Sequence, residues 1–159
     1  MKKNLVSILT IGITGAVAGI IGSSVNYNKQ LLKKQKLSDK HLALFLLMNQ
    51  WVKIKQEGKS ISAFLGEKGY RKIAIYGMSY VGETLLRELK NSAINVECAI
   101  DKNVDMIYSE IDVIGPDSEI PEVDAVIVTA VSFFEEIKTA MKYKTKADIL
   151  SLEDILYEI

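Results

Sequence analysis

The segment from Gly77 to Gly82, GMSYVG, has two glycines at the spacing of a phosphate-binding turn. It follows an apolar run that ends at Tyr76 and precedes a helical pattern, so it joins a buried strand to a helix. In such turns the first glycine permits the bend, the second admits a pyrophosphate and the third lets the helix pack on the strand. Gly77 and Gly82 fill the first and third positions. Ser79 replaces the second glycine, and its side chain would crowd a pyrophosphate, although its hydroxyl could donate to a single phosphate.

A carboxylate lies where the ribose of a bound nucleotide would need a hydrogen-bond acceptor. Asp101 ends the next predicted strand, and a carboxylate there accepts hydrogen bonds from ribose hydroxyls. The helix after the turn supplies free backbone N–H groups and a positive dipole. Glu83 suits that dipole by itself and would compete with a bound anion. Three hypotheses stay open: a nucleotide or nucleotide-sugar, which we favour, a dinucleotide such as NAD(P), or no small ligand.

We predict that this ligand lies at the carboxyl ends of the strands. The candidate residues are Gly77, Met78, Ser79, Tyr80, Gly82, Asp101, Lys102, Thr129 and Ser132. They form no recognisable acid–base or nucleophile set, and the chain has no Tyr-x-x-x-Lys pair, so we assign no catalytic residue. The chain has one cysteine and one histidine, which excludes a cysteine-based metal site, and we expect no metal.

Strands and helices alternate through the second half of the chain. Five strands are expected, over residues 71–76, 95–101, 111–117, 124–131 and 147–152. Ser132 and Glu135 fit a capping box for the helix after the fourth strand, and Ser151 fits a cap for a short terminal helix. Right-handed crossovers then predict an α/β fold: a reduced Rossmann-like parallel sheet of order 3-2-1-4-5 over residues 70–159.

The N-terminal segment, residues 1–36, has the character of a membrane anchor. The 21 residues from Leu5 to Val25 carry no charge, and as a helix they would span roughly 30 Å, the thickness of a hydrocarbon core. A cleaved signal peptide is the less favoured alternative. More lysines follow this run than precede it, which predicts a single-pass protein of the cell membrane with a cytoplasmic C-terminal domain.

The same N-terminal segment also indicates which partners the protein could bind. Gly12, Gly15, Gly19 and Gly22 lie along one face of the predicted span and would allow homo-oligomerisation in lipid. Six lysines and no acids in residues 1–36 leave the rest of the chain with 14 basic and 20 acidic residues. An acidic domain behind a basic segment favours contact with anionic lipid and does not favour nucleic acid.

Two connecting helices are expected over residues 37–69. Ser38 or Asp39 would cap the first, which Gly58 would end, and Ser60 would cap the second. The first includes seven consecutive apolar residues, 42–48, so its surface must be covered by its own domain, by a partner or by the membrane interface.

The sequence of residues 70–152 resembles small Rossmann-like domains of bacterial surface-polysaccharide proteins, through KIAIYGMSYVGETLLREL, NVECAIDKN and DAVIVTA. These include the N-terminal domain of sugar acetyltransferases and the cofactor domain of membrane-bound nucleotide-sugar dehydratases. GMSYVGETL also resembles the opening of nucleotide-sugar dehydrogenases. The resemblance implies that Gly77, Ser79, Gly82 and Asp101 surround a nucleotide. It implies a binding or regulatory role in capsule or exopolysaccharide synthesis. A scaffold that recruits a glycosyltransferase, and a reduced NAD-dependent enzyme, are the alternatives.

Overall fold

The computed structural model describes the backbone of residues 2–159 and the side chains of residues 27–159. The chain divides into two compact units, Met1–Leu44 and Phe45–Ile159. The predicted anchor, residues 5–25, and its four glycines lie outside the residues whose side chains are described. Among the described residues, no helix has the length and apolar character needed to cross a membrane.

The predicted helix start at Ser38 or Asp39 is wrong, because helix α1 (Lys2–Gln56) continues through both residues. Both residues favour helix starts through local hydrogen bonds, but each is also tolerated on an exposed helix face, where they lie here. The second connecting helix is confirmed as α2 (Ile61–Glu67): the Ser60 hydroxyl accepts a hydrogen bond from the N–H of Ala63 at 3.1 Å. Gly58 and Gly69 bound it on either side with positive φ angles.

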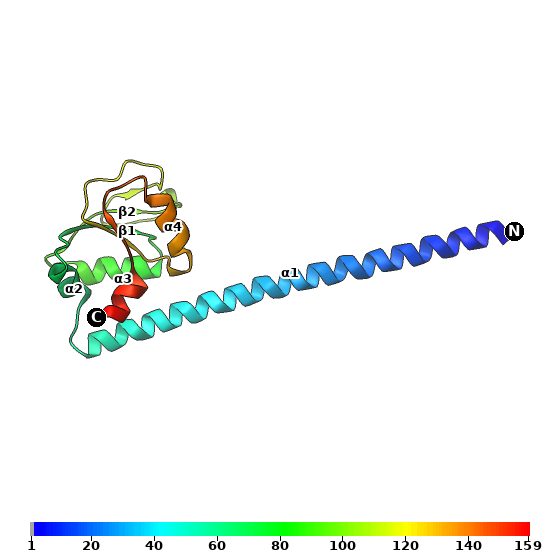
Figure 1. The fold of residues 1–159 in the computed structure, drawn as a ribbon, viewed down its shortest axis with the longest axis horizontal. Coiled ribbons are helices and arrows are strands. Elements are labelled where there is room, and N and C mark those ends of the chain that lie inside the picture. Colours follow the sequence, from blue (N-terminus) through cyan, green and yellow to red (C-terminus); the bar gives the residue numbers. More distant parts are fainter. Residues whose placement is uncertain (1) are drawn as a thin grey trace. The chain divides into compact units, whose positions relative to one another are not determined.

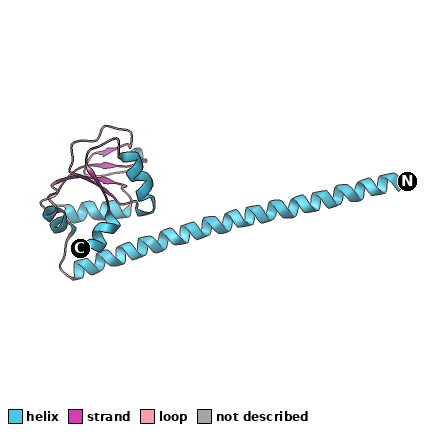
Figure 2. Cartoon of the chain, viewed as in Figure 1, coloured by secondary structure: helices cyan, strands magenta, loops and turns pink. Residues whose placement is uncertain are grey.

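The second unit is an α/β domain with a five-stranded parallel sheet of order β3-β2-β1-β4-β5, as predicted (Figure 2). The strands are β1 (Lys72–Tyr76), β2 (Asn95–Ile100), β3 (Val113–Ile114), β4 (Ala125–Val128) and β5 (Asp148–Ser151). β3 is shorter than expected. The connection before it contains only the 3₁₀ turn Val104–Met106.

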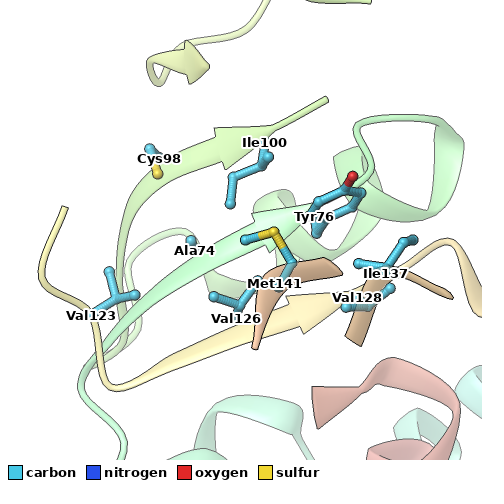
Figure 3. Close-up of a cluster of buried hydrophobic side chains, with 9 residues drawn as sticks. All are labelled: Ala74, Tyr76, Cys98, Ile100, Val123, Val126, Val128, Ile137 and Met141. Atoms are coloured by element: carbon cyan, nitrogen blue, oxygen red, sulfur yellow. The ribbon is translucent and has the colours of Figure 1, made fainter. Parts of the chain in front are cut away.

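The central strands are apolar because both faces of the sheet are covered. β1 and β4 are buried along almost their whole length, as is usual for parallel strands between helix layers. One face carries a cluster that packs on Ile137 and Met141 of α4 (Phe134–Met141) (Figure 3). Helix α3 (Tyr80–Leu89) packs on β1 and β2, on the opposite side of the sheet from α4 (Figure 1). Right-handed crossovers that leave β1 and β4 in opposite directions require this arrangement.

The capping box predicted at Ser132 is wrong. A 3₁₀ turn (Val131–Phe133) precedes α4, whose N-cap is Phe133, and no side chain caps the helix. The N–H of Phe133 donates to the carbonyl of Ala130 at 2.8 Å, and the helix starts one residue later than predicted. The terminal helix α5 (Leu152–Glu158) does begin as expected, because the Ser151 hydroxyl accepts from the N–H of Asp154 at 3.4 Å.

Cys98 is expected to react very slowly with thiol reagents in the folded protein. Its side chain is 2% exposed, and burial, with the nearby carboxylates of Glu97 and Asp112, raises the pKa of the thiol to about 11. At pH 8 only about one thiol in a thousand would be ionised, and the thiolate is the reactive form. Labelling with a chromogenic disulfide should therefore be at least about a hundredfold slower in buffer than in denaturant. Equal rates would show that Cys98 is accessible.

Candidate functional site

The glycine turn, residues 77–79, leaves the carboxyl end of β1 at the centre of the sheet. Gly77 has φ of +100°, which side chains rarely adopt, and a Cβ there would lie 2.8 Å from the Thr129 hydroxyl. Gly82 is equally constrained, because a Cβ there would lie 2.1 Å from the carbonyl oxygen of Gly77. The two glycines thus hold the first turn of α3 directly against the end of β1, in the way that their spacing predicts.

Neighbouring strand ends hold the turn in place. The N–H of Gly77 donates to the carbonyl of Ile100 on β2 at 2.8 Å. The buried Thr129 hydroxyl, at the end of β4, donates to the carbonyl of Gly77 at 2.5 Å. Thr129 was predicted to line a binding site, whereas its hydroxyl faces the backbone of the turn.

Asp101 also contacts the turn, from the end of β2. One oxygen of its carboxylate accepts from the N–H of Met78 at 2.8 Å, and the other accepts from the N–H of Asn103 at 2.9 Å. The predicted role was to accept hydrogen bonds from a ribose. A carboxylate oxygen has a second lone pair, so the half-buried Asp101 keeps acceptor capacity for a hydroxyl while it holds the turn.

The first turn of α3 presents unpaired donors beside these groups. The first N–H groups of any α-helix lack partners within the helix. Ser79 is the N-cap, but its side chain makes no capping hydrogen bond. Within the described part of the chain, the N–H groups of Tyr80, Val81 and Gly82 make no hydrogen bond. Glu83 pairs with Arg87 at 3.8 Å, which partly offsets the negative charge next to these donors.

A cavity of about 480 Å³ runs along α3, from Met78 before its first turn to Lys90 at its other end. It is lined by Met78, Glu83, Leu86, Arg87, Lys90, Tyr108, Ser109 and Glu110. Only Met78 was predicted from the sequence. Residues 108–110 form the far wall and belong to the connection between β2 and β3. They lie in no strand or helix, so the strand pattern of the sequence offered no reason to assign them to a site. Lys90 and Glu110 form an ion pair across the cavity at 2.5 Å.

One predicted residue lies apart from this group, and three others are exposed. Ser132 lines a separate cavity of about 320 Å³ together with Glu135, Glu136, Glu153 and Asp154, whose carboxylates disfavour an anion. Lys102 is exposed directly after Asp101. Ser79 and Tyr80 are exposed on the turn itself, and the Tyr80 side chain is 84% accessible.

Fold and site together define the class: an α/β protein with a glycine turn at the centre of a five-stranded parallel sheet. The chain belongs to the C2185-like family, whose N-terminal domain model matches residues 69–148. No curated protein matches the chain. The matched residues include the glycine turn, Asp101 and Thr129.

Replacing Asp101 with alanine is expected to destabilise the domain as well as alter any ligand site. The N–H of Met78, a residue that is 4% exposed, would lose its acceptor. Loss of a buried acceptor costs about 1–3 kcal/mol. Urea unfolding should show this loss without ligand. Unchanged stability would mean that the carboxylate is free for another role. Asp105→Ala, on an exposed neighbour in the same connection, is the control.

Proposed function

We propose that this protein is a nucleotide- or nucleotide-sugar-binding regulatory module of bacterial capsule or exopolysaccharide synthesis. In this proposal residues 5–25 anchor it in the cell membrane, with the Rossmann-like domain in the cytoplasm. The resemblance of residues 70–152 to domains of surface-polysaccharide proteins supports the biological setting. The unpaired donors of α3, beside a cavity of suitable size, support the ligand class.

One observation carries the proposal: the N–H groups of Tyr80, Val81 and Gly82 make no hydrogen bond in the described structure. Met78 and Glu83, which flank this part of the chain, line a cavity of about 480 Å³. Ligand cavities in proteins are usually about 300–1,000 Å³. A helix N-terminus favours phosphate through its N–H groups and its dipole. A phosphate at these donors would leave the base or sugar near Met78 and Glu83, at the adjoining end of the cavity.

A binding role fits better than catalysis. The polar groups around the turn, Asp101 and Thr129, are engaged in holding its backbone, and neither has a base or nucleophile beside it. These same contacts favour a second candidate, a scaffold without ligand that recruits a glycosyltransferase, because they stabilise the turn without any bound molecule.

Ser79→Asp separates the two candidates. Ser79 has the extended backbone of an N-cap, with φ of −78° and ψ of −171°, so aspartate fits there and suits the helix dipole. The same carboxylate would repel a phosphate at the N–H groups of α3. We expect unchanged or higher thermal stability, with affinity for phosphate-bearing ligands lower by about tenfold or more. Ser79→Asn, which has the same shape and no charge, is the matched control.

The measurement is thermal unfolding of the full chain in mild detergent with UDP-sugars, NAD, CoA and simple nucleotides. A bound ligand at a hundred times its dissociation constant adds about 2.7 kcal/mol to the free energy of unfolding. If no ligand shifts the transition, the scaffold is the better interpretation. A ligand that shifts the wild-type and Ser79→Asp proteins equally binds somewhere else.

A further inference from the structure

Helix α1 buries one face and leaves another apolar face uncovered. In the second unit, Leu47, Trp51 and Ile54 recur at helical spacing and are at most 3% exposed. Phe45 is 66% exposed and Val52 is 52% exposed. The apolar run of residues 42–48 is therefore only partly covered by its own domain.

Phe45 and Val52 lie seven residues apart, and a spacing of three and four connects them to other uncharged positions of α1. Nine positions, which we name the α1 seam, continue this spacing: Asn28, Leu31, Gln35, Ser38, Leu42, Phe45, Asn49, Val52 and Gln56. All nine are exposed and none is charged. The other 20 positions of residues 28–56 include eight lysines and aspartates. In a coiled coil the residues at this spacing face the partner helix, where a charge would be buried without a partner.

We propose that the α1 seam forms a parallel, in-register coiled coil with a second copy of this chain. Leu42, Phe45 and Val52 supply the apolar contacts. Asn49 lies at an a position, where an asparagine pairs with its own counterpart and specifies register. An identical, in-register helix places amide against amide at this level, so a second copy satisfies the polar seam residues as well as the apolar ones.

Flanking charges favour the parallel orientation. In a parallel pair, a g residue lies next to the e residue five positions later in the other helix. Lys34 is a g residue and Asp39 is the matching e residue, so opposite charges meet. In an antiparallel pair, g residues lie next to g residues and e residues next to e residues, so Lys34 and Asp39 would not meet.

Engineered cysteines test register and orientation in the full chain, and the burial of Cys98 limits background reaction. Under mild oxidation, Ser38→Cys and Asn49→Cys should each form a disulfide-linked dimer of one kind of chain. Lys40→Cys, on the face away from the seam, should not. If Ser38→Cys crosslinks only when mixed with Asn49→Cys, the helices are antiparallel and the proposal is wrong.

A charge in the seam tests the interface itself. Phe45→Glu leaves the core intact because Phe45 is mostly exposed. It should weaken dimerisation by about tenfold or more, since a carboxylate would be buried without a partner. Lys40→Glu is the matched control and should not change the affinity. Sedimentation in density-matched detergent reports the mass. A wild-type chain that stays monomeric, or a Phe45→Glu dimer of unchanged affinity, would overturn the proposal and leave this face to lipid or to another protein.

Discussion

Gly82→Ala is expected to reduce the free energy of unfolding by about 3 kcal/mol or more, which is enough to unfold a marginal domain. The new Cβ would lie 2.1 Å from the carbonyl oxygen of Gly77 and 3.0 Å from its carbonyl carbon. Both are backbone atoms, and hydrogen bonds from Thr129 and to Ile100 hold that backbone in place, so neither can move aside cheaply. Helix propensity alone would predict a gain in stability for Gly82→Ala, since alanine in a helix is usually favoured over glycine by about 1 kcal/mol.

Gly66→Ala is the matched control for Gly82→Ala. Gly66 also lies within a helix, but its Cβ would meet only the end of the Arg71 side chain, at 3.1 Å. That side chain is exposed and flexible, so the control should be neutral or slightly more stable. Urea unfolding of both variants measures the difference. If Gly82→Ala were as stable as Gly66→Ala, the close approach of α3 to β1 would not exist in solution.

Glu88→Ala should be the most damaging change at a charged residue, with a loss of about 3 kcal/mol. The Glu88 carboxylate accepts from the indole N–H of Trp51 at 2.6 Å and from the N–H of Ile61 at 3.3 Å. It also pairs with Lys55 at 3.2 Å, and its side chain is only 10% exposed. Its removal leaves donors from the end of α1 and the start of α2 without an acceptor, in a place where Trp51 is nearly buried.

Trp51 is the single tryptophan of the chain, so its fluorescence reports this contact directly. Glu88→Gln keeps one carbonyl acceptor and should lose less stability than Glu88→Ala. Glu119→Ala, at an exposed glutamate, serves as the control. An unfolding midpoint for Glu88→Ala equal to that of Glu119→Ala would show that Glu88 does not attach the end of α1 to the domain.

The proposed dimer and the proposed ligand site involve different parts of the protein, so they can be tested independently. Ser79→Asp acts at the carboxyl edge of the sheet, whereas Phe45→Glu acts on the exposed face of α1. A loss of ligand binding with an intact dimer, or the reverse, would show which of the two proposals fails.

Local sequence patterns were enough to predict the sheet, its strand order and the roles of Gly77 and Gly82. These features follow from local patterns: apolar runs of strand length, a turn that needs Gly77, and a helix start that needs Gly82. Strand order then follows from the handedness of short crossovers. The match of the C2185-like model to residues 69–148 covers this same part of the chain.

The hydrogen-bond partners of the polar groups could be seen only in the folded protein. Asp101 and Thr129 hydrogen-bond to the turn, Ser132 lies in a different cavity, and residues 108–110 form a cavity wall that has no strand or motif to mark it. The covered side of α1 was likewise visible only in the folded protein. Seven consecutive apolar residues occur on all sides of a helix, so their pattern does not indicate which side is buried. Such choices depend on contacts between residues far apart in the chain, and a local pattern contains no information about which distant partner satisfies a carboxylate, a hydroxyl or an apolar face.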